Sequence, residues 1–221
     1  MDISENYKRV KAEVEKEAAG REVLLLPVSK FKTVEEMEQA FCAGARCFGE
    51  NYVQELIAKK EYFGDRAEFH FIGHLQKNKV KYIVDKVSLI HSVDSEALAD
   101  EIEKQCAKRQ IRLDVLIEVN IGGELSKSGV APERLMELAE YITQLPHLRL
   151  SGLMVIPPVE NGSSYFKSVY QLFIDMKNKK LDNTDIRFLS MGMSGDYPEA
   201  IRCGANIVRV GTAIFGSRKV K

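Results

Sequence analysis

The chain has 221 residues, of which 45% are hydrophobic and 29% charged, and its 32 basic and 32 acidic side chains cancel. That composition is typical of a globular protein with a substantial core. The cancelling charges leave no basic field to hold a nucleic acid backbone, and no apolar stretch approaches the length of a membrane span. We therefore expect neither nucleic acid nor membrane as a partner.

The start of the chain predicts a charged helix and no secretory signal. Residues 1–20 contain no apolar core of the kind that a signal peptide needs, and Asp2 with Glu5 is typical of a capping box at a helix start. The four cysteines include no CxxC pair and no His/Cys cluster with zinc-like spacing. The sequence therefore predicts a cytoplasmic protein with reduced thiols and no metal site.

After this helix, short apolar runs alternate with helical patterns. The predicted strands are Val23–Val28, Arg46–Phe48, Phe69–Ile72, Ser88–Ser92, Leu113–Val119, Leu148–Ile156, Ile186–Leu189 and Asn206–Val210. The predicted helices between them are Thr33–Ala43, Asn51–Lys60, Lys77–Val84, Ser95–Arg109, Pro132–Gln144, Ser163–Asn178 and Pro198–Cys203. Alternation of this kind is typical of parallel strands joined by helical crossovers. Eight such strands in this length predict a single-domain (β/α)8 TIM barrel over residues 1–221, with residues 1–20 as an extra helix. A doubly wound open sheet is the alternative.

The loops after the last two predicted strands combine glycine with hydroxyl side chains. In a (β/α)8 barrel the chemistry lies at the C-terminal ends of the strands, and phosphate is often bound after strands seven and eight. Here those loops read SMGMSGD and RVGTA. Glycine lets backbone N–H groups approach an anion, and Ser194 and Thr212 can donate O–H groups. We therefore predict a phosphate site in these loops, although each glycine taken singly is better explained as a turn residue.

A lysine ends the first predicted strand. Lys30 has the same two-residue period as Leu24, Leu26 and Val28, so its amine is expected above the barrel interior. A partly desolvated amine favours its neutral, nucleophilic form. The sequence thus predicts an imine at Lys30 with a phosphorylated carbonyl compound, the alternative being an ordinary solvated lysine. Four rival amines do not end an apolar run: Lys32, Lys77, Lys79 and Lys127.

Arg209 is expected to point inward from the eighth strand. An arginine beside a pyridine nitrogen cannot easily accept a proton and would leave that nitrogen largely unprotonated. The alternative is a salt bridge across the barrel mouth with Glu50 or Asp196.

Seven motifs in order resemble the pyridoxal phosphate homeostasis protein family: VSKFK, FGENYVQE, HFIGHLQKNK, SKSG, RLSGLMVIPP, LSMGMSGDYPEAI and VRVGTAIFG. The resemblance covers essentially the whole chain. It implies a barrel like the N-terminal domain of alanine racemases, of the fold type III kind, with pyridoxal 5′-phosphate carried as a Schiff base on Lys30. It also implies that Ser194, Gly211 and Thr212 contact the phosphate. Arg209 would face the pyridine nitrogen, and Asn51 the ring substituents. Met193 and His74 complete the predicted cofactor-binding set, and Met154 would line the pocket.

Two classes of function remain open at this point. A racemase needs an acid/base group on each face of the substrate carbon. In alanine racemases a second domain supplies the opposite tyrosine, and this chain ends directly after the eighth unit. Tyr52, Tyr165 and Tyr197 remain candidates without a position. The resemblance implies instead a role in vitamin B6 homeostasis without established turnover, so we expect a carrier with no catalytic residue. It would be a monomer, with apo forms of pyridoxal phosphate enzymes as candidate partners. A Schiff-base aldolase, with Glu50 as proton-transfer partner, is the weaker alternative.

Overall fold

Eight parallel strands form one sheet in a computed structural model that describes residues 2–124, 128–158 and 162–217. The strands are β1 Leu24–Pro27, β2 Cys47–Glu50, β3 Glu68–Phe71, β4 Leu89–Val93, β5 Leu113–Val119, β6 Leu148–Val155, β7 Thr184–Ser190 and β8 Ile207–Val210. Their order in the sheet is β1-β8-β7-β6-β5-β4-β3-β2. The sheet therefore curls into a nearly closed barrel, as the strand–helix alternation predicts.

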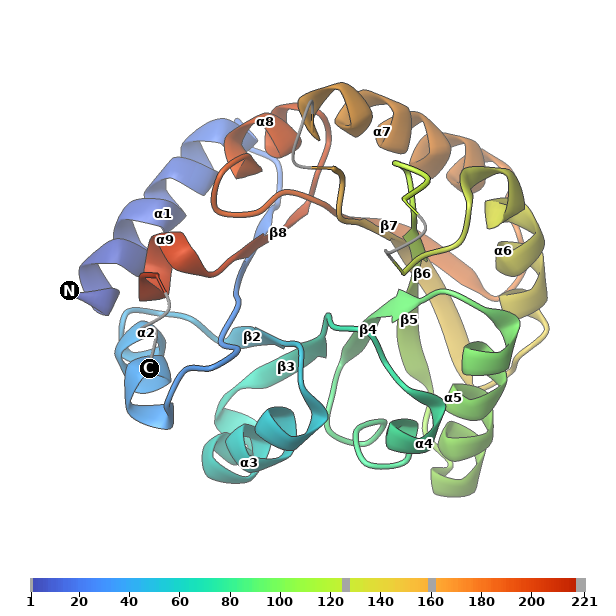
Figure 1. Ribbon diagram of the computed structural model, residues 1–221, viewed down its shortest axis with the longest axis horizontal. Helices are drawn as coiled ribbons and strands as arrows, with labels where there is room; N and C mark the ends of the chain where they lie inside the picture. Colours follow the sequence, from blue (N-terminus) through green and yellow to red (C-terminus); the bar gives the residue numbers. More distant parts are fainter. Residues whose placement is uncertain (1, 125–127, 159–161, 218–221) are drawn as a thin grey trace.

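Helices surround this ring of strands (Figure 1). They are α1 Ile3–Ala18, α2 Val34–Cys42, α3 Val53–Phe63, α4 Lys77–Val80, α5 Glu96–Arg109, α6 Leu135–Thr143, α7 Gly162–Asn178, α8 Tyr197–Arg202 and α9 Thr212–Phe215, with 3-10 turns at Gly64–Arg66 and Pro132–Arg134. The extra helix α1 begins at an Asp2 cap, whose side chain accepts from the Glu5 N–H, and packs against α8, α9 and α2. Among the described residues, no helix is long and apolar enough to cross a membrane.

The predicted helix Lys77–Val84 is wrong in its second half. The helix α4 ends at Val80, and the chain continues in turns in which Tyr82, Ile83 and Lys86 each donate to the carbonyl three residues earlier. These tighter turns bury Val80, Ile83 and Val84 against the outer face of the barrel. Packing of these apolar side chains has overridden the helical spacing.

The two edge strands of the sheet meet along a seam. Strands β1 and β2 share an isolated bridge between Val28 and Gly49, and the Ser29 N–H donates to the Gly49 carbonyl at 3.0 Å. The Leu24 and Val28 N–H groups bond the β8 side, so the missing N–H of Pro27 faces the seam. This explains how proline fits a barrel strand, since no ladder bond is lost there.

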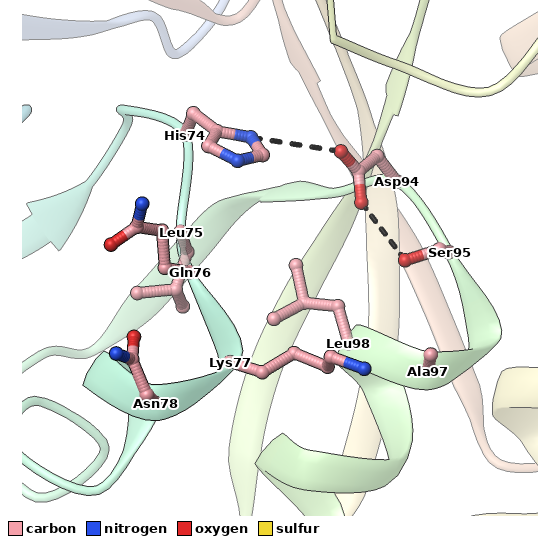
Figure 2. Close-up of a pocket in the computed structure, with 9 residues that line it drawn as sticks. All are labelled: His74, Leu75, Gln76, Lys77, Asn78, Asp94, Ser95, Ala97 and Leu98. Atoms are coloured by element: carbon pink, nitrogen blue, oxygen red, sulfur yellow. Dashed lines mark hydrogen bonds and ion pairs between the residues drawn. The ribbon is translucent and has the colours of Figure 1, made fainter.

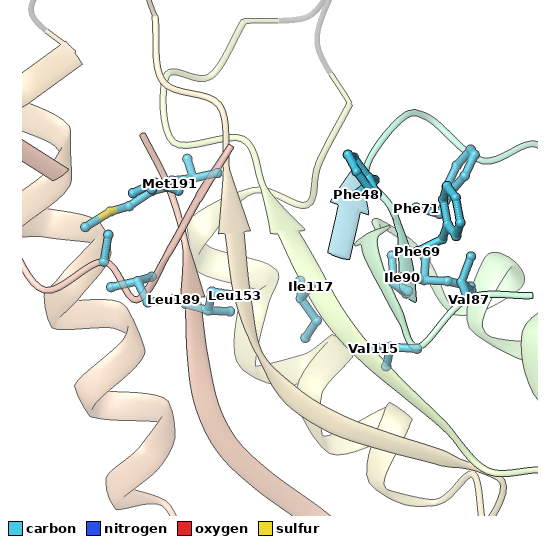
Figure 3. Packing of buried hydrophobic residues seen from close by; sticks show 14 of the residues in the cluster. Phe48, Phe69, Phe71, Val87, Ile90, Val115, Ile117, Leu153, Leu189 and Met191 are labelled. Atoms are coloured by element: carbon cyan, nitrogen blue, oxygen red, sulfur yellow. The ribbon is translucent and has the colours of Figure 1, made fainter. Parts of the chain in front are cut away.

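Two apolar layers hold the barrel. Between strands and helices lies a large core, part of which Figure 3 shows, with Phe48, Phe69 and Ile117 among its members. Inside the barrel, a smaller layer consists of Leu26, Ile72, Leu89, Leu116, Met154 and Ile207. Leu24 and Val28 pack against this inner layer, which confirms the predicted inward period of the first strand. Met154 thus fills the barrel beneath the mouth.

Candidate functional site

The C-terminal ends of the strands bring the predicted residues to one mouth. Lys30 follows β1 and is half-buried, Asn51 follows β2, and Arg209 lies on β8, where it is the register partner of Leu26. Because β1 pairs with β8, Gly211 lies against Val28: a Cβ atom placed on Gly211 would lie 3.5 Å from the Val28 side chain. The lysine loop and the eighth-strand loop are therefore neighbours.

The loop that carries Lys30 is fixed on both sides by a buried ion-pair network. The Lys59 ammonium, which is 5% exposed, donates to the Ser29 carbonyl at 2.7 Å and to the Glu50 carboxylate at 2.6 Å. It also donates to the Glu55 carboxylate at 2.7 Å, and the other side of the lysine is held because Glu55 accepts the Phe31 N–H at 2.8 Å. The residues before and after Lys30 are thus both tied to α3 and β2.

Glu50 does not face the barrel mouth. Gly49 points inward, against Leu26 and Ile72, so the alternation of β2 turns Glu50 outward toward α3. Its carboxylate is fully buried and accepts from Lys59 and from the Ser29 hydroxyl at 2.6 Å. Burial raises the pKa of the Glu50 carboxyl, and Lys59 opposes the rise. The aldolase alternative, which needs Glu50 beside Lys30, therefore loses its proton-transfer partner.

The other lysines named as rivals lie apart from the mouth or are engaged. The Lys32 amine donates to the Phe215 carbonyl at 2.9 Å and pairs with Glu36. Lys77 and Lys79 lie on α4, and Lys127 falls outside the described residues. Lys59, which sequence reasoning missed, is a structural ion. Glu55 lies only four residues before it on α3, but the contacts of Lys59 with Glu50 and Ser29 span nine and thirty residues and leave no local signal in the sequence.

Arg209 is buried and starts a hydrogen-bond chain across the barrel. Its guanidinium donates to the Ser190 carbonyl at 2.8 Å, the Ser190 hydroxyl at 2.7 Å and the Val155 carbonyl at 2.8 Å. Ser190 Oγ lies 3.0 Å from His91 Nδ1, and His91 Nε2 lies 3.0 Å from His70 Nδ1. Burial lowers the pKa of Arg209 to about 10. Burial also lowers the pKa of His70 to about 4 and that of His91 well below its usual value, so both imidazoles are neutral near pH 7. The described contacts contain no salt bridge from Arg209 to Glu50 or Asp196.

The loops after β7 and β8 are joined by one hydrogen bond. The Ser194 hydroxyl accepts the Ala213 N–H, 3.2 Å away in the first turn of α9. The Asp196 side chain accepts the Met193 N–H at 2.6 Å and so closes the β7 loop, which leaves the Met193 side chain exposed. At a helix start the first N–H groups have no intrahelical acceptor, and here those groups belong to Gly211, Thr212 and Ala213. The Ser194 side chain thus contacts the first turn of α9, which begins at Thr212.

A cavity of about 310 Å³ opens at the mouth and is lined by Asn51, His74, Glu118 and Ile156 among others. Asn51 Oδ1 is buried there with no hydrogen-bond partner among the described residues. His74 lies on the rim, 3.2 Å from Ser128 Oγ and 3.8 Å from Asp94. Figure 2 shows that His74 also borders a second, outward groove that runs along Lys77 and Leu98. His74 therefore separates the mouth from this groove.

Comparisons with known proteins agree with this geometry. Residues 2–219 match the family described as alanine racemase, N-terminal domain. A pyridoxal phosphate homeostasis protein of Aquifex aeolicus is 45% identical over 99% of this chain and 100% of its own length. PipY of Synechococcus elongatus, solved with pyridoxal phosphate bound, is 31% identical with a TM-score of 0.86, over 97% of this chain and all of that one. An alanine racemase of Clostridium difficile, at 14% identity and a TM-score of 0.73, covers 98% of this chain and 58% of its own and shares the fold.

The fold and the mouth thus define a barrel of the alanine racemase N-terminal type with a lysine after its first strand. Within that class, the chain belongs to the pyridoxal phosphate homeostasis protein family.

The contribution of the buried Lys59 to stability can be tested by comparison with the neighbouring surface residue Lys60. Lys59→Met leaves the Glu50 carboxylate buried without a counter-charge, and we expect it to lower the free energy of unfolding by about 3–5 kcal/mol. Lys60→Met removes a lysine whose amine contacts the Gly64 carbonyl and Asp65 at the surface, and should cost less than about 1 kcal/mol. Urea unfolding of both variants measures the difference. Equal losses of unfolding free energy in the two variants would show that the buried Lys59 contacts do not stabilise the fold more than a surface lysine does.

Glu118 gives the stability a distinctive pH dependence. Burial, together with the nearby Asp94, raises the pKa of the Glu118 carboxyl from 4.5 to about 7, with Arg209 opposing. Between these values the folded state holds a proton that the unfolded state has lost, so this group's contribution to stability falls as pH rises. Glu118→Gln should therefore gain stability relative to the parent by up to about 3 kcal/mol between pH 5 and pH 8. Unfolding curves at both pH values, with the exposed Glu133→Gln as control, check this; a pH-independent difference would contradict it.

Proposed function

We propose that this protein binds pyridoxal 5′-phosphate and acts in the intracellular balance of vitamin B6. The observation that carries the proposal is the juxtaposition at the mouth: Lys30 follows β1, whose neighbour β8 leads into the glycine and hydroxyl loop at Gly211 and Thr212. The relative from Synechococcus elongatus has been solved with the cofactor, and relatives at 40–45% identity are named for this homeostasis. We propose the same role for this chain.

Lys30 would hold the cofactor covalently, as a Schiff base. Pyridoxal phosphate supplies an aldehyde for a primary amine and a phosphate dianion for an anion site. The chain's contribution is to fix where the amine stands. Hydrogen bonds to Ser29 and Phe31 on either side of Lys30 restrict the loop, so the side chain has few places to reach.

The phosphate would lie between the β7 and β8 loops. The Ser194 and Thr212 hydroxyls can donate to phosphate oxygens, and the N–H groups of Gly211 and Thr212 stand at the start of α9, where they have no intrahelical acceptor. The hydrogen bond from Ala213 to Ser194 holds the two loops at a fixed spacing. Fixed donors lose little entropy when an anion arrives.

Asn51 and Arg209 suit the ring of this cofactor. Asn51 Oδ1 is a buried acceptor that finds no partner within the described part of the chain, a costly state that a donor on the ligand, such as the phenolic hydroxyl of pyridoxal, would relieve. Arg209 can donate and cannot accept, so it would leave a facing pyridine nitrogen unprotonated. An unprotonated ring is a weaker electron sink, which favours holding the cofactor over driving carbanion chemistry.

A racemase is the second candidate, and the tyrosines decide how it is tested. The Tyr197 hydroxyl donates to Glu13 of α1 at 2.6 Å, so it lies outside the barrel. Tyr52 is exposed, and its ring lies 5.0 Å from that of Phe31, the residue after Lys30. Of these two tyrosines, Tyr52 is therefore the one that could serve as the second acid/base group of a racemase. Incubation of the loaded protein with L-alanine, followed by chiral chromatography, tests it; we expect no turnover, and turnover lost in Tyr52→Phe would replace the carrier proposal.

Replacement of Lys30 is the direct test of attachment. Lys30→Ala should lose the visible absorbance of the imine and the adduct that borohydride fixes, while some affinity for pyridoxal phosphate remains through the phosphate loops. Lys32→Ala is the matched control, because its amine is already held by Phe215 and Glu36. Peptide mapping after reduction identifies the modified residue. An adduct on another lysine in the Lys30→Ala protein would move the site.

The phosphate loops should govern retention more than attachment. Ser194→Ala and Thr212→Val each remove a donor to a charged group, worth about 1.5–3 kcal/mol, so pyridoxal phosphate should dissociate roughly 10- to 100-fold faster. Unphosphorylated pyridoxal should react at a nearly unchanged rate. Thr143→Val, whose hydroxyl bonds the Glu140 carbonyl on α6, serves as control. Unchanged dissociation in both loop variants would remove the phosphate from these loops.

A further inference from the structure

A second polar cluster lies inside the barrel near the N-terminal ends of β2 and β3, away from Lys30. Cys47 and Glu68 are direct register partners on these two strands, and His70 follows Glu68 by two residues. Residues two apart on a strand face the same side, and Cys47 packs against the inner apolar layer. The thiol sulfur, a carboxylate oxygen and a ring nitrogen of the three residues all lie within 4.8 Å of one another.

We propose that Cys47, Glu68 and His70 bind one divalent transition metal ion of the zinc class, at a site separate from the proposed cofactor mouth. Thiolate and imidazole are typical ligands of zinc, whereas calcium and magnesium bind mainly to oxygen ligands. One thiolate and one carboxylate also balance two positive charges, which matters in an interior of low polarity. With metal–ligand distances of about 2.0–2.3 Å, tetrahedral ligand atoms stand roughly 3.3–3.8 Å apart. The present bound of 4.8 Å lies about 1 Å beyond that spacing, so ion binding would have to draw the three ligand atoms together by about that much.

His70 can offer one ring nitrogen to a metal ion while the other stays hydrogen bonded. Its Nδ1 is hydrogen bonded to His91 Nε2 at 3.0 Å, which leaves Nε2 as the nitrogen for a metal. Metal-bound histidines commonly donate their second ring N–H to a fixed partner, which sets the tautomer. Here His91 would accept from His70 Nδ1 and donate its own Nδ1–H to Ser190 Oγ, 3.0 Å away. Metal binding would thereby fix which nitrogen donates and which accepts in each hydrogen bond of the buried histidine pair.

The seam between β1 and β2 gives a path to this cluster. A cavity of about 220 Å³ lies there, lined by Leu24 and Cys47 and covered by Tyr7 and Val14 of α1 among others. Glu68 is exposed, and its carboxylate accepts from the Ser88 hydroxyl at 3.3 Å. Asp114, the acidic residue on the next strand but one, is already paired with Arg149 at 2.6 Å and Arg187 at 2.9 Å. The three ligands therefore leave the fourth position of the ion for water.

Calorimetric titration of the full-length, cofactor-loaded protein with Zn²⁺ tests the proposal. We expect one equivalent to bind, and Cys47→Ser and Glu68→Gln each to weaken binding by at least about tenfold. Glu68→Gln is the safer variant for folding because its side chain is exposed. With Cd²⁺ as the probe, thiolate-to-metal charge-transfer absorption in the far ultraviolet should appear and should vanish in Cys47→Ser.

Two variants control for adventitious binding. Cys42→Ser removes an exposed thiol at the end of α2, and Glu103→Gln breaks a surface His–Glu pair in which His147 Nδ1 lies 2.7 Å from the carboxylate. Neither should change the affinity. Lys30→Ala should also keep the metal, which separates this proposal from the cofactor assignment. Absence of saturable Zn²⁺ binding, binding unchanged in both Cys47→Ser and Glu68→Gln, or binding lost in Cys42→Ser would overturn the site.

Discussion

The arrangement of the barrel mouth depends on one buried cation. An ammonium taken out of water is costly unless every proton finds an acceptor. The three protons of Lys59 go to two carboxylates and one carbonyl, from Glu50, Glu55 and Ser29. These acceptors belong to the end of β1, the end of β2 and the first turn of α3. The same contacts that compensate the charge therefore fix the first βα loop, and with it the position of Lys30.

Polar groups inside the barrel are likewise held in place by hydrogen bonds to one another. Near the mouth, Arg209 is bound by Ser190 and Val155, so its guanidinium has one orientation. Deeper in the barrel, the neutral pair His91 and His70 links this arginine to the opposite end. Apolar residues such as Leu116 and Met154 fill the space around the chain. A polar core of this kind specifies side-chain geometry, because each alternative packing would leave a buried donor or acceptor unpaired.

Most of the fold could be predicted from the sequence, because strand–helix alternation and the two-residue period are local signals. The inward period of Leu24, Leu26 and Val28 is confirmed by the inner layer. The inward direction of Lys30, which lies in the turn after the strand, stays a prediction. The expectation that Glu50 lies beside Lys30 was wrong. Its neighbour Gly49 could have indicated this, since the smaller residue occupies the crowded inner face of the strand and so turns Glu50 outward. The burial of Lys59 could not be predicted, because two of its three partners, Ser29 and Glu50, come from the ends of β1 and β2 and only Glu55 lies on its own helix. The grouping of Cys47 with Glu68 and His70 could not be predicted either. Strand register brings these residues together, and the register cannot be deduced from their spacing along the sequence.

The seam has a consequence for association between molecules. A barrel whose first and second strands meet at one bridge is, over the rest of their length, an open sheet with two edges. Exposed edges are templates for pairing with strands of other chains. Here one edge carries Pro27, which offers no N–H, and the other begins after the charged Arg46. Helix α1 lies over the gap, with Tyr7 and Val14 buried in the core. The N-terminal helix thus covers part of the gap between the two edges, and covering an edge with a helix is one of the ways in which proteins keep their strands from pairing with other chains.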